Sequence, residues 1–280
     1  MEATGVQGGL IIHVPCDDGA KTAALRIDDK YVVQGLHENT AQVVAARDRI
    51  KSLGQYGATS VDMFDGRRLP YTEGLVNLLV SEELGDLPMA EVMRVLAPGG
   101  VAHVRSSEGW RTIVKPWPEE LDEWTHWLHG PDGNAVANDQ AVGPPRRARW
   151  IAEPTWQRHH ETSPSVDAMV SAGGRIFAIV NEAPVGVDGL PDRWMLVARD
   201  AFNGMLLRKR SIDQWGWSEW SDHSYGHGRW NQPTHIARRL VAVDDQVYAT
   251  LGFNAPLTAL DAATGETLMT YDETGISHMA

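Results

Sequence analysis

Three side chains between residues 119 and 129 have the types and the spacing that could hold a metal ion. Asp122, His126 and His129 recur at intervals of four and three residues, in a segment that Pro118 opens. A helix over residues 119–129 would place all three on one face, and carboxylate and imidazole groups bind divalent cations. The same spacing is typical of a polar helix face over a tryptophan-rich core. We therefore predict no metal and keep the three residues as candidates.

A second set of candidates follows three apolar runs in the first hundred residues, at 10–14, 31–36 and 60–63. The carboxyl ends of parallel strands meet at one edge of a sheet, where ligands bind. Residues just after those runs are therefore expected to share that edge, which makes it the place to look for a ligand site.

The elements that must position these residues alternate between strand and helix patterns. Further strands are expected at 75–80 and 101–104, and helices at 20–27, 89–96 and from Asn39 to about residue 53. Strands that are apolar on both faces and alternate with helices are typical of parallel sheets covered by helices. The pattern predicts a doubly wound, Rossmann-like α/β domain over residues 1–105.

The composition changes after this domain. All eleven tryptophans lie at or after Trp110, and the later sequence has short β-like runs. Such a change indicates a domain boundary. We assign residues 106–167 to a Trp- and Pro-rich linking segment and residues 168–280 to a separate all-β domain.

A repeat supports the all-β prediction. Residues 198–204 match residues 259–265, and each copy follows a strand pattern and carries an Asp-x-x-x-Gly turn. Asp accepts hydrogen bonds from the amides of such a turn, and Gly supplies a positive φ. Repeated strands with such turns are typical of β-propeller blades. Two blades cannot close a propeller, so the sequence predicts an incomplete propeller and a fragment.

Residues 8–104 resemble class I S-adenosylmethionine (SAM)-dependent methyltransferases. The resemblance is carried by the order of elements and by two phrases, residues 64–70 and residues 92–100, the second of which is similar to a "VLKPGG" turn. Residues 168–272 resemble pyrroloquinoline-quinone-type propeller repeats. The chain as a whole is similar to large bacterial proteins that fuse the two.

The first resemblance implies a SAM pocket with a glycine loop, a ribose-binding acid and an adenine-reading Asp. Residues 13–19 keep only Gly19 of the three glycines, because Pro15 and Asp17 stand at the other two. His37 stands in the slot of the ribose-binding acid, with Glu38 adjacent as a substitute. Asp65 matches the adenine-reading residue. The resemblance thus implies that SAM is bound by Cys16, Asp17, Gly19, His37, Glu38, Asp65 and Gly66. Three further residues lie near strand four: Asn77, where many relatives carry an acid, and Ser81 and Glu82, which would line the acceptor side or a solvated loop.

The second resemblance implies a tryptophan four residues after the glycine of each repeat. Arg208 and Met269 stand there instead. The repeats are therefore expected to be structural, and no quinone cofactor is predicted. A Trp- and His-rich loop at 214–235 interrupts the repeat, and long loops on rigid scaffolds often carry function.

Three functions remain open at this point. The first is a SAM-dependent methyltransferase-like protein with a propeller that docks a small molecule or a protein, also through the Trp-rich loop. The second is a binding or scaffold protein whose methyltransferase-like domain is degenerate. The third is a fragment of a quinoprotein oxidoreductase, which Arg208 and Met269 argue against. The side chain of Asp17 discriminates the first two, depending on whether it fills the cofactor site.

Charge and hydropathy limit the partners. The net charge of −12 argues against nucleic acid as a partner. No apolar run is long enough to span a bilayer, and residues 1–9 lack the regions of a signal peptide. We therefore expect no membrane partner. The compartment stays open: cytoplasmic if the chain is complete, periplasmic for longer relatives. The single cysteine excludes an intrachain disulfide.

Overall fold

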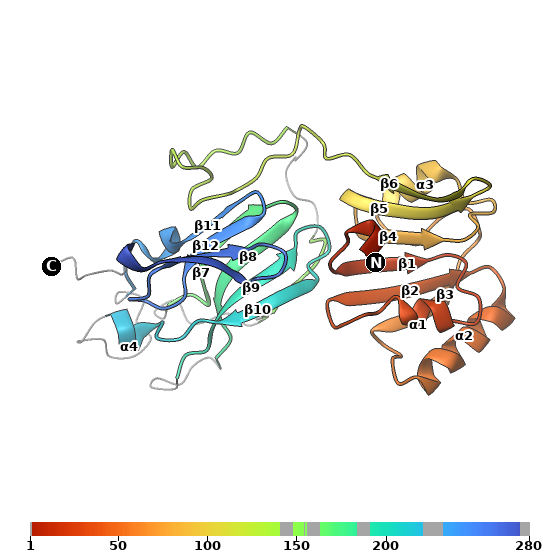
Figure 1. Cartoon of the computed structure of the whole chain (residues 1–280), viewed down its shortest axis with the longest axis horizontal. Coiled ribbons are helices and arrows are strands. Elements are labelled where there is room, and N and C mark those ends of the chain that lie inside the picture. Colours follow the sequence, from red (N-terminus) through yellow and green to blue (C-terminus); the bar gives the residue numbers. More distant parts are fainter. Residues whose placement is uncertain are drawn as a thin grey trace. The chain divides into compact units, whose positions relative to one another are not determined.

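The computed structural model divides into two compact units, residues Met1–Glu119 and Glu120–Ala280. It describes residues 2–140, 148–153, 155, 163–183, 191–220 and 232–274. Within these residues, no helix combines the length and apolarity that a membrane crossing requires. The two units are described separately below (Figure 1).

The first unit is built on one mixed sheet. Its described strands lie in the order β3-β2-β1-β4-β5-β6 and are parallel except for β6, which pairs antiparallel with β5. The predicted Rossmann-like sheet is confirmed in this mixed form. The strands are β1 (Gly9–His13), β2 (Tyr31–His37), β3 (Thr59–Met63), β4 (Val76–Ser81), β5 (Leu96–Ser106) and β6 (Gly109–Val114). The sequence places the end of this domain at residue 105, whereas β6 extends the compact unit to Glu119.

Helices cover both faces of this sheet. Successive β1 residues point to opposite faces, so Ile11 and Ile12 enter two different cores. The core around Ile12 contains Val92 and Val95 of α3. On the other face, α2 contributes Val43 and other residues to a core with β3. The helices are η1 (Glu2–Thr4), α1 (Ala20–Ala24), α2 (Thr40–Ser52) and α3 (Met89–Val95).

One local prediction in this unit is confirmed and one is wrong. The Asn39 side chain caps α2 by accepting hydrogen bonds from the backbone N–H groups of Ala41 and Gln42. Residues 97–100, expected as a turn before the fifth strand, are instead part of β5. Gly100 lies at a register shift between β4 and β5, and a Cβ there would lie 2.8 Å from the carbonyl oxygens of Ala97 and Val76. The glycine thus lets β5 pass close to β4.

The described residues of the second unit form two antiparallel four-stranded sheets, in the orders β10-β9-β8-β7 and β11-β12-β13-β14. Each sheet contributes one apolar face to a single core, and β11 lies beside β7. The strands are β7 (Val166–Ala172), β8 (Arg175–Asn181), β9 (Trp194–Asp200), β10 (Leu206–Ser211), β11 (Leu240–Val243), β12 (Gln246–Thr250), β13 (Leu257–Asp261) and β14 (Thr267–Tyr271). Short helices α4 (Trp217–Trp220), η3 (Ile236–Arg239) and η4 (Asp272–Thr274) accompany them.

The repeated turns adopt the predicted conformation. Asp200 Oδ1 accepts hydrogen bonds from the amides of Phe202 (2.8 Å) and Asn203 (2.9 Å), and Gly204 has a φ of 73°. Asp261 holds the second turn in the same way, and Gly265 there has a φ of 66°. The turn chemistry read from the sequence is confirmed in both copies.

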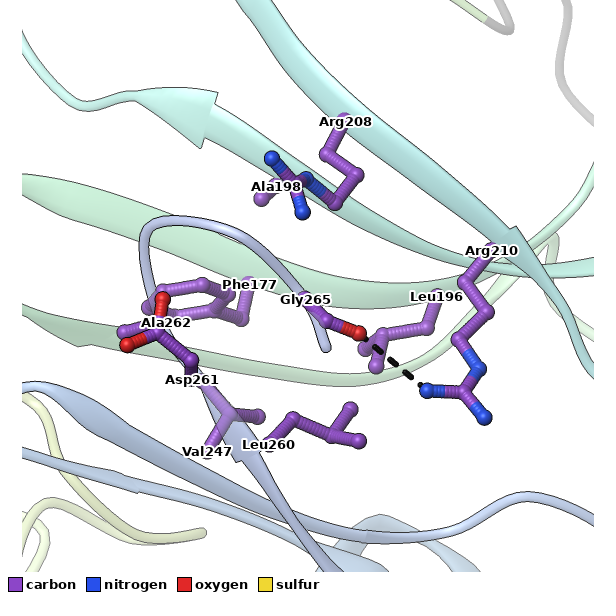
Figure 2. A pocket seen from close by; sticks show the side chains of 10 residues that line it. All are labelled: Phe177, Leu196, Ala198, Arg208, Arg210, Val247, Leu260, Asp261, Ala262 and Gly265. Atoms are coloured by element: carbon purple, nitrogen blue, oxygen red, sulfur yellow. Dashed lines mark hydrogen bonds between the residues drawn. The ribbon is translucent and has the colours of Figure 1, made fainter. Parts of the chain in front are cut away.

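Each turn carries a large side chain over its glycine. A Cβ at Gly204 would lie 2.5 Å from ring atoms of Trp150, whose Nε1 donates to the carbonyl oxygen of Ala201 (3.1 Å). Arg208 packs over Gly265 in the corresponding way. Figure 2 shows Arg208 and Arg210 extending from β10 toward that turn, where Arg210 donates to the Gly265 carbonyl oxygen (3.1 Å). An indole from outside the repeat therefore covers the first turn, and an arginine covers the second.

We expect Trp150→Ala to lower the free energy of unfolding of the second unit by about 2–3 kcal/mol, because the indole loses both its packing and its hydrogen bond. Trp150→Phe keeps a ring over Gly204 and should cost about 1 kcal/mol. Hydrogen exchange of peptides from β9 and β10 in the full chain measures both losses. Unchanged protection in the Ala variant would contradict the packing described here.

Candidate functional site

The parallel strands of the first unit bring four strand ends to one edge of the sheet. His13 at the end of β1 pairs with Gly35 of β2 and with Val80 of β4. His37 at the end of β2 pairs with Met63 of β3. The strand order reverses direction between β1 and β4, and ligands of open α/β sheets bind at such a switch point. This edge is therefore the candidate site.

The loop after β1 turns Cys16 inward. The Cys16 amide donates to the Leu36 carbonyl oxygen (3.0 Å), and the side chain is fully buried in the core beneath α2. Its Cβ occupies the space that a side chain at Gly35 would need. Burial raises the pKa of the thiol to about 11. The sequence places Cys16 at the strand edge, but its thiol is buried and faces the core instead.

Gly19 is required by packing between helices. It precedes α1 with a φ of 82°, and a Cβ there would lie 2.9 Å from the Ala46 carbonyl oxygen in α2. A glycine is favoured at this φ because other residues rarely adopt it. The position therefore sets how closely α1 approaches α2.

Charged side chains gather where the loop meets the end of β4. Lys21 Nζ lies 2.6 Å from Glu82 Oε1 and 3.9 Å from Asp17 Oδ2. The hydrogen bond between Lys21 and Glu82 raises the pKa of the lysine and lowers that of the carboxyl group. Asp17, at a φ of 43°, keeps its side chain 55% exposed, so its carboxylate is not buried in the unit. Two acids and one lysine thus lie together where the loop after β1 meets the end of β4, and Arg105 also acts on Glu82.

Two buried polar groups lie at the ends of β1 and β4. The His13 ring is 2% exposed, and its Nδ1 lies 2.8 Å from Thr22 Oγ1 of α1. Burial lowers the pKa of His13, against the opposing effects of the Asp17 and Glu82 carboxylates. Because its pKa is lowered, the His13 imidazole is neutral near pH 7. At the end of β4, Ser81 Oγ is buried without a hydrogen-bond partner among the described residues.

The end of β2 contributes Glu38 to the edge. His37 Nδ1 accepts the Asn39 amide (2.9 Å) and so belongs to the turn that starts α2. The Glu38 carboxylate instead lies directly over Gly66, leaving no space for a Cβ there. Gly66 has a φ of 76° and is buried. The acid that reaches the loop after β3 is therefore Glu38.

Asp65 is held in the turn next to Glu38 and Gly66. Its Oδ1 accepts the amides of Arg67 (2.9 Å) and Arg68 (2.7 Å). The hydrogen bonds from the Arg68 and Arg67 amides lower the pKa of the exposed Asp65 carboxyl group, which is therefore ionised near pH 7. Two acids on neighbouring loops can thus accept hydrogen bonds from one ligand.

Asn77 lies outside this edge. It stands at the amino-terminal end of β4, where its Oδ1 accepts the Leu10 amide (2.8 Å). The residues at the opposite end of β4 are Ser81 and Glu82. The contacts of Asn77 therefore support β1 instead of a ligand.

The helix predicted over residues 119–129 is wrong. The Trp124 carbonyl oxygen accepts from the Ser171 amide of β7 (2.7 Å), and that of Thr125 accepts from the Ala242 amide of β11 (3.0 Å). Because these carbonyls bond to strands, they are not available for the hydrogen bonds of a helix. The segment runs against both sheets and ends in a hairpin where the His126 amide donates to His129.

The three metal candidates do not share one face. His129 Nε2 lies 2.7 Å from Asp122 Oδ2, but the His126 ring bonds through Nδ1 to the Thr125 hydroxyl (2.8 Å). Across the residues that the structure covers, no three His, Cys, Asp or Glu side chains form a group that could hold a metal ion. The contact between Asp122 and His129 instead stabilises the hairpin.

The Trp-rich loop is only partly described, because residues 221–231 lie outside the described residues. At its start, Trp215 is buried and donates from Nε1 to Asp167 Oδ2 (3.1 Å). Trp220 and Ile236 enter the core between the two sheets. These residues of the loop support the second unit.

Comparisons with known proteins point to methyltransferases over part of the chain. The chain is 30% identical over 99 residues to "Methyltransferase GfsG" of Streptomyces halstedii, which covers 33% of this chain and 36% of that protein. The chain therefore spans about a third of the curated relative that it matches. No protein-family profile matches the chain.

Three solved structures each match a similar share of this chain. The [4+2]-cyclase SpnF matches with a TM-score of 0.34 and 24% identity, over 37% of this chain and 40% of that one. Geranyl diphosphate C-methyltransferase of Streptomyces coelicolor A3(2) matches with a TM-score of 0.35 and 20% identity, over 37% and 42%. A putative SAM-dependent methyltransferase of Methanococcus maripaludis matches with a TM-score of 0.35 and 18% identity, over 37% of this chain and 50% of that one.

The residues at the strand edge fit SAM by their chemistry. Glu38 and Asp65 supply carboxyl oxygens as acceptors for a ribose diol and an exocyclic amine, and Gly66 leaves room for the Glu38 side chain beside the loop of Asp65. Lys21, Asp17 and Glu82 supply both charge signs for the zwitterionic end of the cofactor. The sequence alone does not indicate the pairing of Lys21 with Glu82, because the two are 61 residues apart.

We expect Gly19→Ala to destabilise the first unit by about 2–3 kcal/mol, because it combines an unfavourable φ with a clash. Gly54→Ala is the matched control, since Gly54 has a φ of 69° with open space around it. The control should cost only about 1 kcal/mol. Hydrogen exchange of peptides from β1 and β2 measures both, and equal losses would contradict close packing of Gly19 on α2.

We expect the first unit to lose stability as the pH falls below 6.5, the ordinary pKa of histidine. Burial depresses the pKa of His13, so below 6.5 the unfolded chain binds a proton that the folded chain lacks. His13→Gln should reduce this slope between pH 6.5 and about 5, above the range where carboxylates titrate, and His103, whose pKa burial also lowers, should account for the slope that remains. Unfolding free energies at several pH values measure it, and an unchanged slope in the variant would argue against a neutral His13.

Proposed function

We propose that the first unit binds SAM at the carboxyl edge of its sheet and acts as a methyltransferase of the class I type, on an acceptor that stays open. The observation that carries the proposal is the meeting of Glu38 with Gly66 beside Asp65 at this edge. The sequence similarity to a methyltransferase over 99 residues supports it. When bound, SAM supplies an electrophilic methyl group on a sulfonium.

Two sets of residues would contact the two ends of the cofactor. Glu38 and Asp65 would hold the nucleoside, and Lys21 with Glu82 would orient the methionine end. The half-exposed carboxylate of Asp17, which lies farther from Lys21 than Glu82 does, would favour a cationic sulfonium over a neutral ligand. The half-exposed side chain of Asp17 leaves room beside the loop, which supports a working pocket over one that Asp17 fills.

A second candidate is a binding or scaffold protein whose methyltransferase-like unit no longer holds the cofactor. It is favoured by the loop after β1, where His13, Pro15 and Asp17 replace an acid and two glycines of the motif that methyltransferases share. A side chain at position 17 stands where the motif lets backbone approach a ligand.

For the second unit, we propose that its two sheets are consecutive blades of an incomplete propeller that binds a small molecule or a protein. The identical strand order of the sheets, their shared core and the adjacent strands β7 and β11 support this. So does the equivalent seating of Trp150 on Gly204 and of Arg208 on Gly265.

Calorimetric titration of SAM into the full chain tests the proposed pocket. We expect binding that weakens about 10- to 100-fold in Glu38→Gln and in Asp65→Asn, the range for hydrogen bonds to charged groups. Asp62→Asn is the matched control, because Asp62 is an exposed acid at the end of β3 that pairs with Arg47.

Absence of binding by the folded chain would favour the second candidate. In that case Asp17→Gly tests the reason. Recovery of binding in this variant would attribute the loss to the side chain at position 17, and continued absence would remove SAM from the function.

A further inference from the structure

A cavity of about 460 Å³ lies in the second unit, on the side where the hairpin of residues 126–133 meets η3 and β11. Its volume falls within the range of small-ligand pockets. Its lining combines one indole, one imidazole and two opposite charges, from Trp127, His126, Asp132 and Arg238. None of these residues takes part in the site of the first unit, which lies at the edge of a different sheet.

The hairpin that forms one wall is firmly held. Leu128 and His129 have φ values of 61° and 78°, conformations that residues other than glycine rarely adopt. Such conformations persist only where the surroundings impose them, and they concentrate at ligand sites. Here Asp122 fixes His129 and also accepts the Asn138 amide (2.6 Å).

The opposite wall is fixed to the same hairpin. The guanidinium of Arg238, from η3, lies 5.0 Å from the centre of the Trp127 ring. Val241 of β11 adds an apolar side chain, and the next residue, Ala242, donates its amide to Thr125. The cavity is thus built from two chain segments that hydrogen bonds hold together.

We infer that this cavity binds a neutral saccharide, with a pyranose ring packed against Trp127. A pyranose has a C–H face that packs on an indole and a rim of hydroxyls that both donate and accept hydrogen bonds. Trp127 supplies an apolar surface of low conformational freedom. Asp132 accepts from hydroxyls, and Arg238 and His126 are placed to donate.

The lining favours a saccharide over other ligands. Arg238 and Asp132 balance each other, so the cavity has no excess charge to hold an anion or a cation. Arg238 covers one face of Trp127, so a ligand ring can pack only against the other face, and its rim then lies among polar groups that suit hydroxyls better than an aromatic edge. The inference does not depend on SAM binding by the first unit, because the residues that carry it are all in the second.

Calorimetric titration of cellohexaose, xylohexaose, maltohexaose and chitohexaose into the full chain, without SAM, tests the inference. We expect at least one to bind and Trp127→Ala to weaken it roughly tenfold or more, with partial recovery in Trp127→Phe. Asp132→Asn should also weaken binding. Trp117→Ala, which removes a partly exposed indole from the first unit, is the matched control and should bind as the unmodified chain does.

Two outcomes would overturn the inference. The first is no binding of any of the four oligosaccharides up to roughly 10 mM by a chain whose circular dichroism shows it to be folded. The second is binding that Trp127→Ala leaves unchanged. Inorganic phosphate is titrated in parallel, and phosphate binding that Arg238→Ala abolishes, with no saccharide bound, would make this an anion site.

Discussion

The position of β1 between two parallel partners is the constraint on which the candidate SAM site depends. Ile11 and Ile12 are fully buried on opposite faces, so β1 cannot shift by one residue without exchanging two cores. That register fixes His13 beside Gly35 and Val80. The ends of β2 and β4 then fall at the same edge, and the loops that carry Glu38 and Glu82 follow from it.

Close contacts at glycines set the arrangement in both units. The missing side chain of Gly19 leaves room for the backbone of α2, and that of Gly100 leaves room for the backbone of β4. In the second unit, Gly204 and Gly265 each receive a large side chain, from Trp150 and Arg208. Arg208 stands where the resemblance implies tryptophan, and its aliphatic stem can cover a glycine as an apolar side chain does. A large side chain therefore covers the glycine of each repeated turn, although it is an indole in one and an arginine in the other.

The sequence predicts most of the first unit, because its central strands β1 and β4 are apolar on both faces and helix caps such as Asn39 are local, but it misses the largely exposed β6. It fails over residues 119–129, because the helical spacing of Asp122, His126 and His129 carries no sign that β7 and β11 take the carbonyls of this segment. Pairings between distant residues, such as Lys21 with Glu82, are equally invisible in local patterns. The site is therefore predicted in its residue types and not in its contacts.

Retention of Gly19 is weak support for cofactor binding, because its contact with Ala46 explains the glycine without any ligand. Glu38 and Asp65 carry more weight. Packing of the unit does not require two exposed acids on adjoining loops, whereas a ligand with hydrogen-bond donors could use both. The replacements in the loop after β1 concern the opposite part of the edge, where Lys21 and Glu82 add charges of both signs. In the proposed site, the half assigned to the nucleoside keeps its two acids, and the half assigned to the methionine end has charged residues where the motif has glycines, which favours an altered pocket over an abandoned one.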